Sequence, residues 1–326
     1  MAIHLSKVTN NPLVPRYIKD DISKTVAALV LIKTYSKRIV EQPELHLKIS
    51  DNYASFRNFS DYQTTFKQHA YYLLNCLTPS LISVASDLID YAEMFQCFYY
   101  ETQSIVPFLG KKNEAKERFV DLLDRLEKEA EKSKSNAQAM AAILQEFKSE
   151  IQSDNDKFRA ELKVVNQNFD AAIEELTAFP ATIPMPSSNP PKIPIISSGS
   201  QTFANIIASL ADYLNQLQEP YQKITLIYTN TCLLNQVTED FESLFETTCY
   251  ICEAHKAITT EWLSILANLK SFKREISNAS HNLNTVQIES NLKLANSEWD
   301  TISQKTQEMV VRVLSIKPEE MNTALN

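Results

Sequence analysis

Glycine is almost absent from this chain: Gly110 and Gly199 are the two glycines among 326 residues, where average usage predicts roughly twenty. β-Hairpins need glycine at turns with positive φ, and Rossmann or P-loop sites need it where backbone approaches phosphate. Long apolar runs are also missing, because the longest, residues 26–32, is far short of the ~20 residues of a spanning helix. These shortages disfavour sheets and nucleotide sites and predict a protein made in soluble form.

The charge balance and the cysteine content argue against a nucleic-acid partner and a disulfide-bonded scaffold. The 32 basic and 40 acidic side chains give a net charge of −8. No block of Lys or Arg occurs, so nucleic acid is not an expected partner. The five cysteines are an odd number spread over long segments, which predicts reduced, buried thiols rather than a disulfide framework. The N-terminus carries no classical secretion signal.

No group of residues has the pattern of a catalytic or metal site. Cys249 and Cys252 have redox or metal spacing, but they lack a second cysteine pair. The histidines are scattered, and the acidic residues of 111–150 alternate with lysines as on a solvated helix face. We interpret the two cysteines, and also Trp262 and Trp299, as packing residues. We therefore expect no enzyme, no cofactor and no metal.

Apolar periodicity predicts helices along most of the chain. Residues 17–40 form a first helix, and 60–106 a long second one in which the register slips at Pro79. From 111 to 178 apolar residues keep a four-three rhythm, interrupted at Ser133, which is typical of a coiled-coil seam and corresponds to roughly 100 Å of helix. Two shorter helices are expected near the C-terminus, around 262–276 and 291–314.

A proline-rich tip interrupts the helices. Six of the chain's thirteen prolines lie within residues 180–194, a density that no helix survives. The apolar side chains of this tip, and of the charge-free helix face that follows it, are the candidate membrane or partner contacts. They are Phe179, Ile183, Met185, Ile193, Ile195, Ile196, Phe203, Ile206, Ile207, Leu210 and Leu214.

These elements predict an all-α fold, an elongated bundle of long antiparallel coiled-coil helices with the tip inserted between two of them. We expect one domain over 1–326, with a helical hairpin at 111–248. The tip and insertion region is 178–214, and 1–110 with 249–326 form a tail bundle.

The layout resembles the cytolysin A superfamily of α-helical pore-forming toxins, most closely the smaller, B-type subunits of xenorhabdolysin-type binary toxins. Residues 260–269 (TEWLSILANL) and 294–302 (LANSEWDTI) are similar to the Trp-bearing tail helices of those toxins. Many members carry an uninterrupted Gly/Ala-rich hairpin at the tip, whereas this tip is short, broken by prolines and amphipathic. It therefore resembles a subunit that needs a more hydrophobic partner.

The resemblance implies a secreted, haemolysin-like virulence factor, released without a cleaved signal. Such a subunit would form a hetero-oligomeric pore with a second, more hydrophobic toxin subunit in target-cell membrane lipid. The flanking face 203–214 would meet lipid, while Asn205, Ser209 and Asp212 would face the lumen. The competing interpretation is a non-lytic coiled-coil scaffold or adaptor that docks a protein through its apolar tip.

Overall fold

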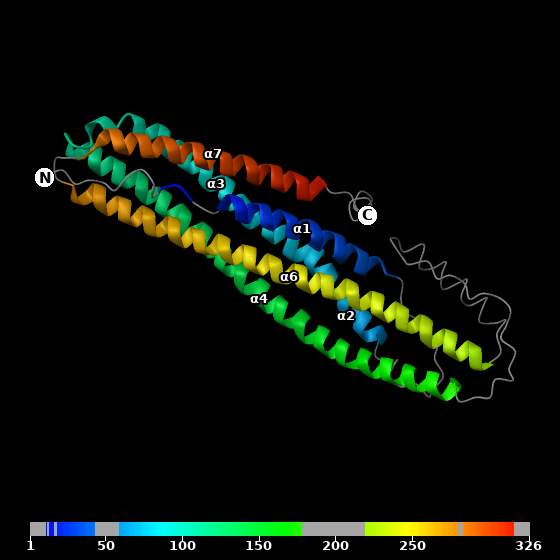
Figure 1. The fold of residues 1–326 in the computed structure, drawn as a ribbon. Coiled ribbons are helices and arrows are strands. Elements are labelled where there is room, and N and C mark those ends of the chain that lie inside the picture. Colours follow the sequence, from blue (N-terminus) through cyan, green and yellow to red (C-terminus); the bar gives the residue numbers. More distant parts are fainter. Residues whose placement is uncertain are drawn as a thin grey trace. The chain divides into compact units, whose positions relative to one another are not determined.

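A computed structural model describes residues 11, 13–15, 18–42, 59–177, 219–279 and 283–315; side chains are described for most of them. Every regular element in these ranges is helical (Figure 1), which confirms the all-α prediction. The elements are α1 (Ile18–Glu41), α2 (Phe59–Tyr72), the π-helix η2 (Leu73–Leu77), α3 (Thr78–Gln103), the 3-10 helix η3 (Val106–Phe108), α4 (Asn113–Thr177), α6 (Glu219–Asn278) and α7 (Thr285–Ser315).

The long helices follow the predicted periodicity. The expected seam helix is α4, which is 65 residues long and buries the apolar seam positions from Phe119 to Phe158. The prediction of a separate helix around 262–276 is wrong, because these residues form the last part of the 60-residue α6. No proline or glycine lies between Pro220 and the end of α6, so nothing in the sequence stops this helix earlier.

The irregularity expected at Pro79 lies just before it. A π-helical turn, η2, connects α2 to α3, and Pro79 sits in the first turn of α3. Because proline has no N–H and its ring clashes with the carbonyl four residues earlier, the hydrogen-bond ladder widens over the preceding turn. The predicted register slip is therefore confirmed, one turn earlier than the proline itself.

The chain divides into two compact units, and each is described by itself. Unit 1 comprises Met1–Val30, Leu77–Glu146 and Thr248–Ile316. Unit 2 comprises Leu31–Cys76, Phe147–Thr247 and Lys317–Asn326. The prediction of a single domain stays a prediction.

Unit 1 shows how α4 and α6 pair. His255 Nε2 lies 2.9 Å from the carbonyl of Ala137, and the Cys252 thiol donates to the carbonyl of Leu144 at 3.5 Å. Nearer the other end of α4, Lys116 Nζ donates to the carbonyl of Ala279 at 3.0 Å. Since lower numbers on α4 meet higher numbers on α6, the two helices run antiparallel, as the sequence predicts.

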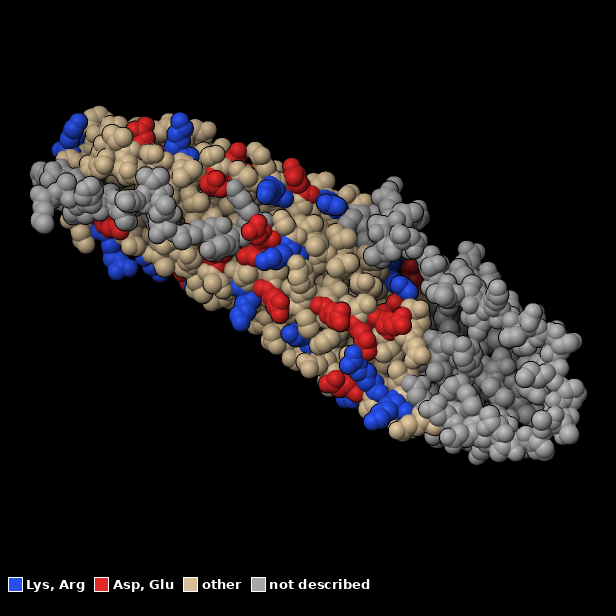
Figure 2. Space-filling view, viewed as in Figure 1, with Lys and Arg blue, Asp and Glu red and all other residues tan. Residues whose placement is uncertain are grey.

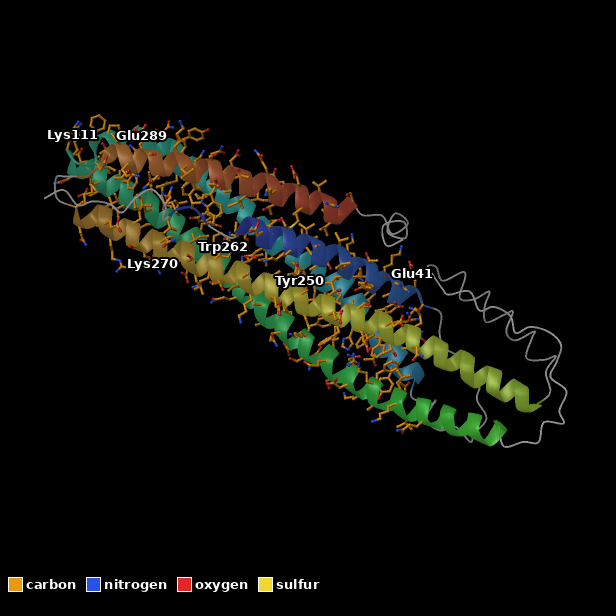
Figure 3. All side chains as sticks on the ribbon, viewed as in Figure 1. Glu41, Lys111, Tyr250, Trp262, Lys270 and Glu289 are labelled. Carbon is orange, nitrogen blue, oxygen red and sulfur yellow. The ribbon has the colours of Figure 1, made fainter. Side chains whose placement is uncertain are left out.

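The core of unit 1 is aromatic. Trp262 of α6 and Trp299 of α7 are 0% and 1% exposed, and both rings contact Tyr91 of α3. Trp299 Nε1 donates to the carbonyl of Leu13 at 3.2 Å, which ties the N-terminal arm to α7. The interpretation of both tryptophans as core residues is confirmed. Figure 3 labels Trp262 and, further along α6, Lys270, whose ammonium pairs with Glu127 of α4 at 3.7 Å.

The cysteine prediction needs a correction. Among the described side chains, Cys76, Cys97, Cys249 and Cys252 form no disulfide, in agreement with the expectation of reduced thiols. They are not buried, however: Cys76 and Cys97 are exposed, and the other two are half-buried. The buried positions beside Cys97 are Phe95 and Phe98, so the cysteine falls on the outward side of α3.

Candidate functional site

The side chains predicted to contact membrane or partner all lie outside the described residues, which stop at Thr177 and resume at Glu219. They are Phe179, Ile183, Met185, Ile193, Ile195, Ile196, Phe203, Ile206, Ile207, Leu210 and Leu214. Their role stays a prediction. The structure does describe the helices on either side of this segment, α4 and α6, and how unit 2 holds them.

An aromatic cluster forms the centre of unit 2. Phe66 of α2 stacks on Phe241 of α6, with ring centroids 3.7 Å apart and planes inclined by 17°. The ring of Phe158 on α4 meets Phe66 edge-on at 5.0 Å, and Tyr62 contacts Phe158 at 5.6 Å. The three phenylalanines are at most 1% exposed. Because the rings come from three helices, this cluster joins α2, α4 and α6 in one core.

Polar pairs surround the cluster and join α2 to α4. His69 Nε2 lies 2.9 Å from Asp154 Oδ2, and the Tyr62 hydroxyl donates to Glu161 Oε1 at 2.9 Å. Burial, and then the hydrogen bond to Glu161, raise the pKa of Tyr62 to about 12. Burial alone would raise the pKa of Asp154, but hydrogen bonds from His69 and Lys157 lower it below its ordinary value. Asp154 is therefore ionised at neutral pH and accepts the hydrogen bonds from His69 and Lys157.

A second polar group joins α1 to α6 in unit 2. The Asp240 side chain is 4% exposed and lies 3.2 Å from Arg38 Nε, and Gln42 Nε2 donates to it at 2.7 Å. Burial raises the pKa of Asp240 even though the Arg38 charge and the hydrogen bonds from Gln42 and Gln236 oppose the shift. α4 and α6 are also tied directly, by Arg159 and Glu242 at 2.7 Å. Both helices that flank the tip segment are thus fastened within unit 2.

One apolar feature was missed by the sequence reasoning. Among the described residues, the helix Asp61–Gln103 is long and apolar enough to cross a membrane, with a mean hydropathy of 1.3 over its best window. Only 33% of that window is buried in this structure. The available signal was the stretch 68–86, which contains no Asp, Glu, Lys or Arg. Because core helices of soluble proteins meet the same criterion, the observation marks an apolar segment without assigning it a membrane position.

Cys252 and His255 of α6, which were considered for redox or metal chemistry, contact the backbone of α4. The Cys252 thiol donates to the carbonyl of Leu144 on α4, and the buried His255 donates from Nε2 to the carbonyl of Ala137 on the same helix. Burial lowers the pKa of His255, which favours the neutral ring. Within the described ranges no group of three or more His, Cys, Asp or Glu could hold a metal ion. On the face shown in Figure 2, Lys and Arg are interspersed with Asp and Glu along the helices.

Comparisons with known proteins agree with this architecture. Residues 13–183 match the family model of the Bacillus haemolytic enterotoxin (HBL). The fold is similar to the HblL1 toxin component of Bacillus cereus, with a TM-score of 0.62 and 15% identity over 91% of this chain and 97% of that one. The SmhB pore of the tripartite α-pore-forming toxin Smh from Serratia marcescens gives a TM-score of 0.68 at 12% identity, over 91% and 100% of the two chains. The AhlB pore of the tripartite toxin AHL from Aeromonas hydrophila gives 0.65 at 15% identity, over 95% and 100%. Among curated proteins no match is found.

Proposed function

The chain belongs to the Bacillus haemolytic enterotoxin (HBL) family of α-pore-forming toxin components, and from this premise we propose that it works as one subunit of a multi-subunit pore. The resemblance to α-helical pore-forming toxins found in the sequence is thereby confirmed, and this family consists of toxin components rather than enzymes. The observation that carries the proposal is the family match over residues 13–183, together with one fold shared over nine-tenths of the chain.

In the proposed mechanism, the soluble chain is released, reaches a target-cell membrane and joins a second, more hydrophobic subunit in a hetero-oligomer. The tip region 178–214 then enters the bilayer. Lipid offers no hydrogen-bond partners to backbone, so the segment that crosses it must be helical, and the prolines must lie beyond the hydrocarbon layer. The apolar face of 203–214 would meet lipid, and Asn205, Ser209 and Asp212 would face the lumen.

The described residues support this proposal through the anchoring of α4 and α6. A segment that moves into a membrane needs a base that stays in place, and in unit 2 the stacked rings of Phe66 and Phe241 hold α2 against α6. The pair Arg159 and Glu242 joins the two flanking helices directly.

A matched pair of variants tests where insertion occurs. Ile207→Glu places a charge on the face proposed to meet lipid, at a cost of about 2.5 kcal/mol or more near the bilayer centre. Ser209→Glu places the same charge two residues away, on the face proposed to line the lumen. We expect dye release from phosphatidylcholine–cholesterol vesicles, in the presence of partner subunits, to be abolished by the first variant and retained by the second. Equal release by both variants contradicts insertion through this face.

The same assay separates a toxin from a scaffold. A pore subunit releases dye when its partner subunits are added, whereas a non-lytic adaptor releases none under any combination of partners. The partners to test are longer helical proteins with an uninterrupted hydrophobic hairpin, and neighbouring open reading frames are the first place to look for them. Family membership favours the pore subunit.

A further inference from the structure

We propose that the α2–α4 contact of unit 2 is a clasp whose stability is limited by the buried amide of Asn155, so that the clasp opens when the soluble chain converts to its membrane-bound form. The clasp is defined here as His69–Asp154, Tyr62–Glu161 and Phe66–Phe158 together with Asn155. The inference rests on the proposed pore function and adds the element that releases first.

Asn155 occupies a core position of α4 that an apolar residue would normally fill. Its side chain is 4% exposed, and it lies between Ile151 and Phe158, which are 0% and 1% exposed. Its Oδ1 atom is buried and has no hydrogen-bond donor among the described residues. A buried polar atom without a partner destabilises the folded state, because it loses its hydrogen bonds to water and gains none in return.

Two residues of α4 close to Asn155 contact α2. The preceding residue, Asp154, binds His69 of α2, and Phe158, one turn later, contacts Phe66 of α2. Residues three apart share a helix face, so Asn155 lies on the same side of α4 as Phe158. We infer that the unsatisfied amide oxygen lies at the α2–α4 contact and weakens it.

An asparagine at a single core position of a coiled coil lowers stability while fixing register. Segments that move during function come from the less stable parts of a structure. The clasp fits both descriptions, since it combines a well-packed aromatic pair with one buried, unsatisfied amide. It also lies on α4 before the tip segment, so its opening releases α2 from the helix that leads into the tip, while Arg159 and Glu242 still join that helix to α6.

Unit 1 supplies a matched control. Ser133, also on the seam of α4, is 0% exposed, and its hydroxyl has no partner among the described residues. Removing either polar atom should raise stability by a similar mechanism. Only Asn155 lies in the clasp, so only its replacement should slow opening there.

The test compares Asn155→Leu, of similar volume, with Ser133→Ala and the unmodified chain. We expect both variants to raise the thermal midpoint, and only Asn155→Leu to slow amide exchange of residues 59–72 and 147–164, by about tenfold. The same variant should lengthen the half-time of dye release from phosphatidylcholine–cholesterol vesicles, with partner subunits present, by a similar factor. Asn155→Met serves as the second variant if the leucine does not fit.

The possible results separate the two proposals. If both Asn155 variants are less stable than the unmodified chain, or exchange and release dye at its rates, the clasp is refuted. If Ser133→Ala slows release as much as Asn155→Leu, general stability controls conversion and the clasp is again refuted. If the unmodified chain releases no dye with any partner, the pore function fails, while amide exchange still decides whether Asn155 limits the contact.

Discussion

Phe66 is the residue whose removal should damage unit 2 most clearly. Its ring contacts Phe241 at 3.7 Å, Phe158 at 5.0 Å and Tyr62 at 6.3 Å between centroids, and its side chain is 1% exposed. Phe66→Ala would leave a cavity bordered by rings from α2, α4 and α6. Because two of these partners are themselves buried phenylalanines, the neighbouring side chains have little freedom to close the space.

The expected cost follows from this burial. Replacing a buried phenylalanine with alanine lowers the free energy of unfolding by about 3 to 5 kcal/mol, which combines the lost transfer energy with the cavity term. The stacked contact with Phe241 places Phe66 toward the upper part of that range. With a urea slope of about 3 kcal/mol per M, the unfolding midpoint should fall by about 1 M or more.

Urea unfolding followed by far-UV circular dichroism measures this loss. Both tryptophans, Trp262 and Trp299, lie in unit 1, so tryptophan fluorescence reports that unit while circular dichroism reports the helices of both. Tyr71→Ala is the control on the same helix, because this tyrosine is 60% exposed and should change stability by less than about 0.5 kcal/mol. A loss below about 1 kcal/mol for Phe66→Ala would refute the reasoning.

Two further predictions concern buried titratable groups. Because burial raises the pKa of Asp240 above its ordinary 3.8, the carboxyl stabilises the fold when protonated and loses this contribution as the pH rises through the raised value. Asp240→Asn should therefore leave the stability at pH 7 unchanged or raise it, and any gain should shrink toward pH 4. Thermal unfolding measures this effect. A strong loss of stability at pH 7 would show that the ion pair with Arg38 dominates. Burial lowers the pKa of His255 below 6.5, so its contribution is present above pH 6.5 and lost as the pH falls through the lowered value. His255→Gln should flatten the decline of unfolding free energy between pH 6.5 and 5, and an unchanged slope would assign the decline to other groups.

The positions of the long helices could be predicted from the sequence because the apolar seam of α4 repeats over most of its length and few breakers interrupt it. The same reasoning failed inside α6. A separate helix was expected around 262–276, yet no proline or glycine follows Pro220 within α6, which ends at Asn278. A helix end needs a breaker or a cap, and the sequence offers no breaker between Pro220 and Trp262.

The contacts within unit 2 could not be predicted, because they depend on which helices lie side by side. Phe66, Phe158 and Phe241 all appear in the sequence as seam positions, but only the register between α2, α4 and α6 brings their rings together. The exposed Cys76 and Cys97 show the same limit, since cysteine content does not reveal which side of a helix faces the core. Asn155 has a polar side chain at a seam position, and this was the available signal for the clasp.

The most direct measurement places a reporter on the tip. In a chain whose five native cysteines are replaced by serine, Ile207→Cys would carry an environment-sensitive fluorophore, and Ser209→Cys would carry it in a parallel sample. After vesicles and partner subunits are added, we expect the label at 207 to shift to the blue and to be quenched by quenchers on lipid acyl chains, while the label at 209 stays accessible to aqueous iodide. If the label at 207 remains in water while the vesicles release their dye, the tip does not enter the membrane and the account is contradicted.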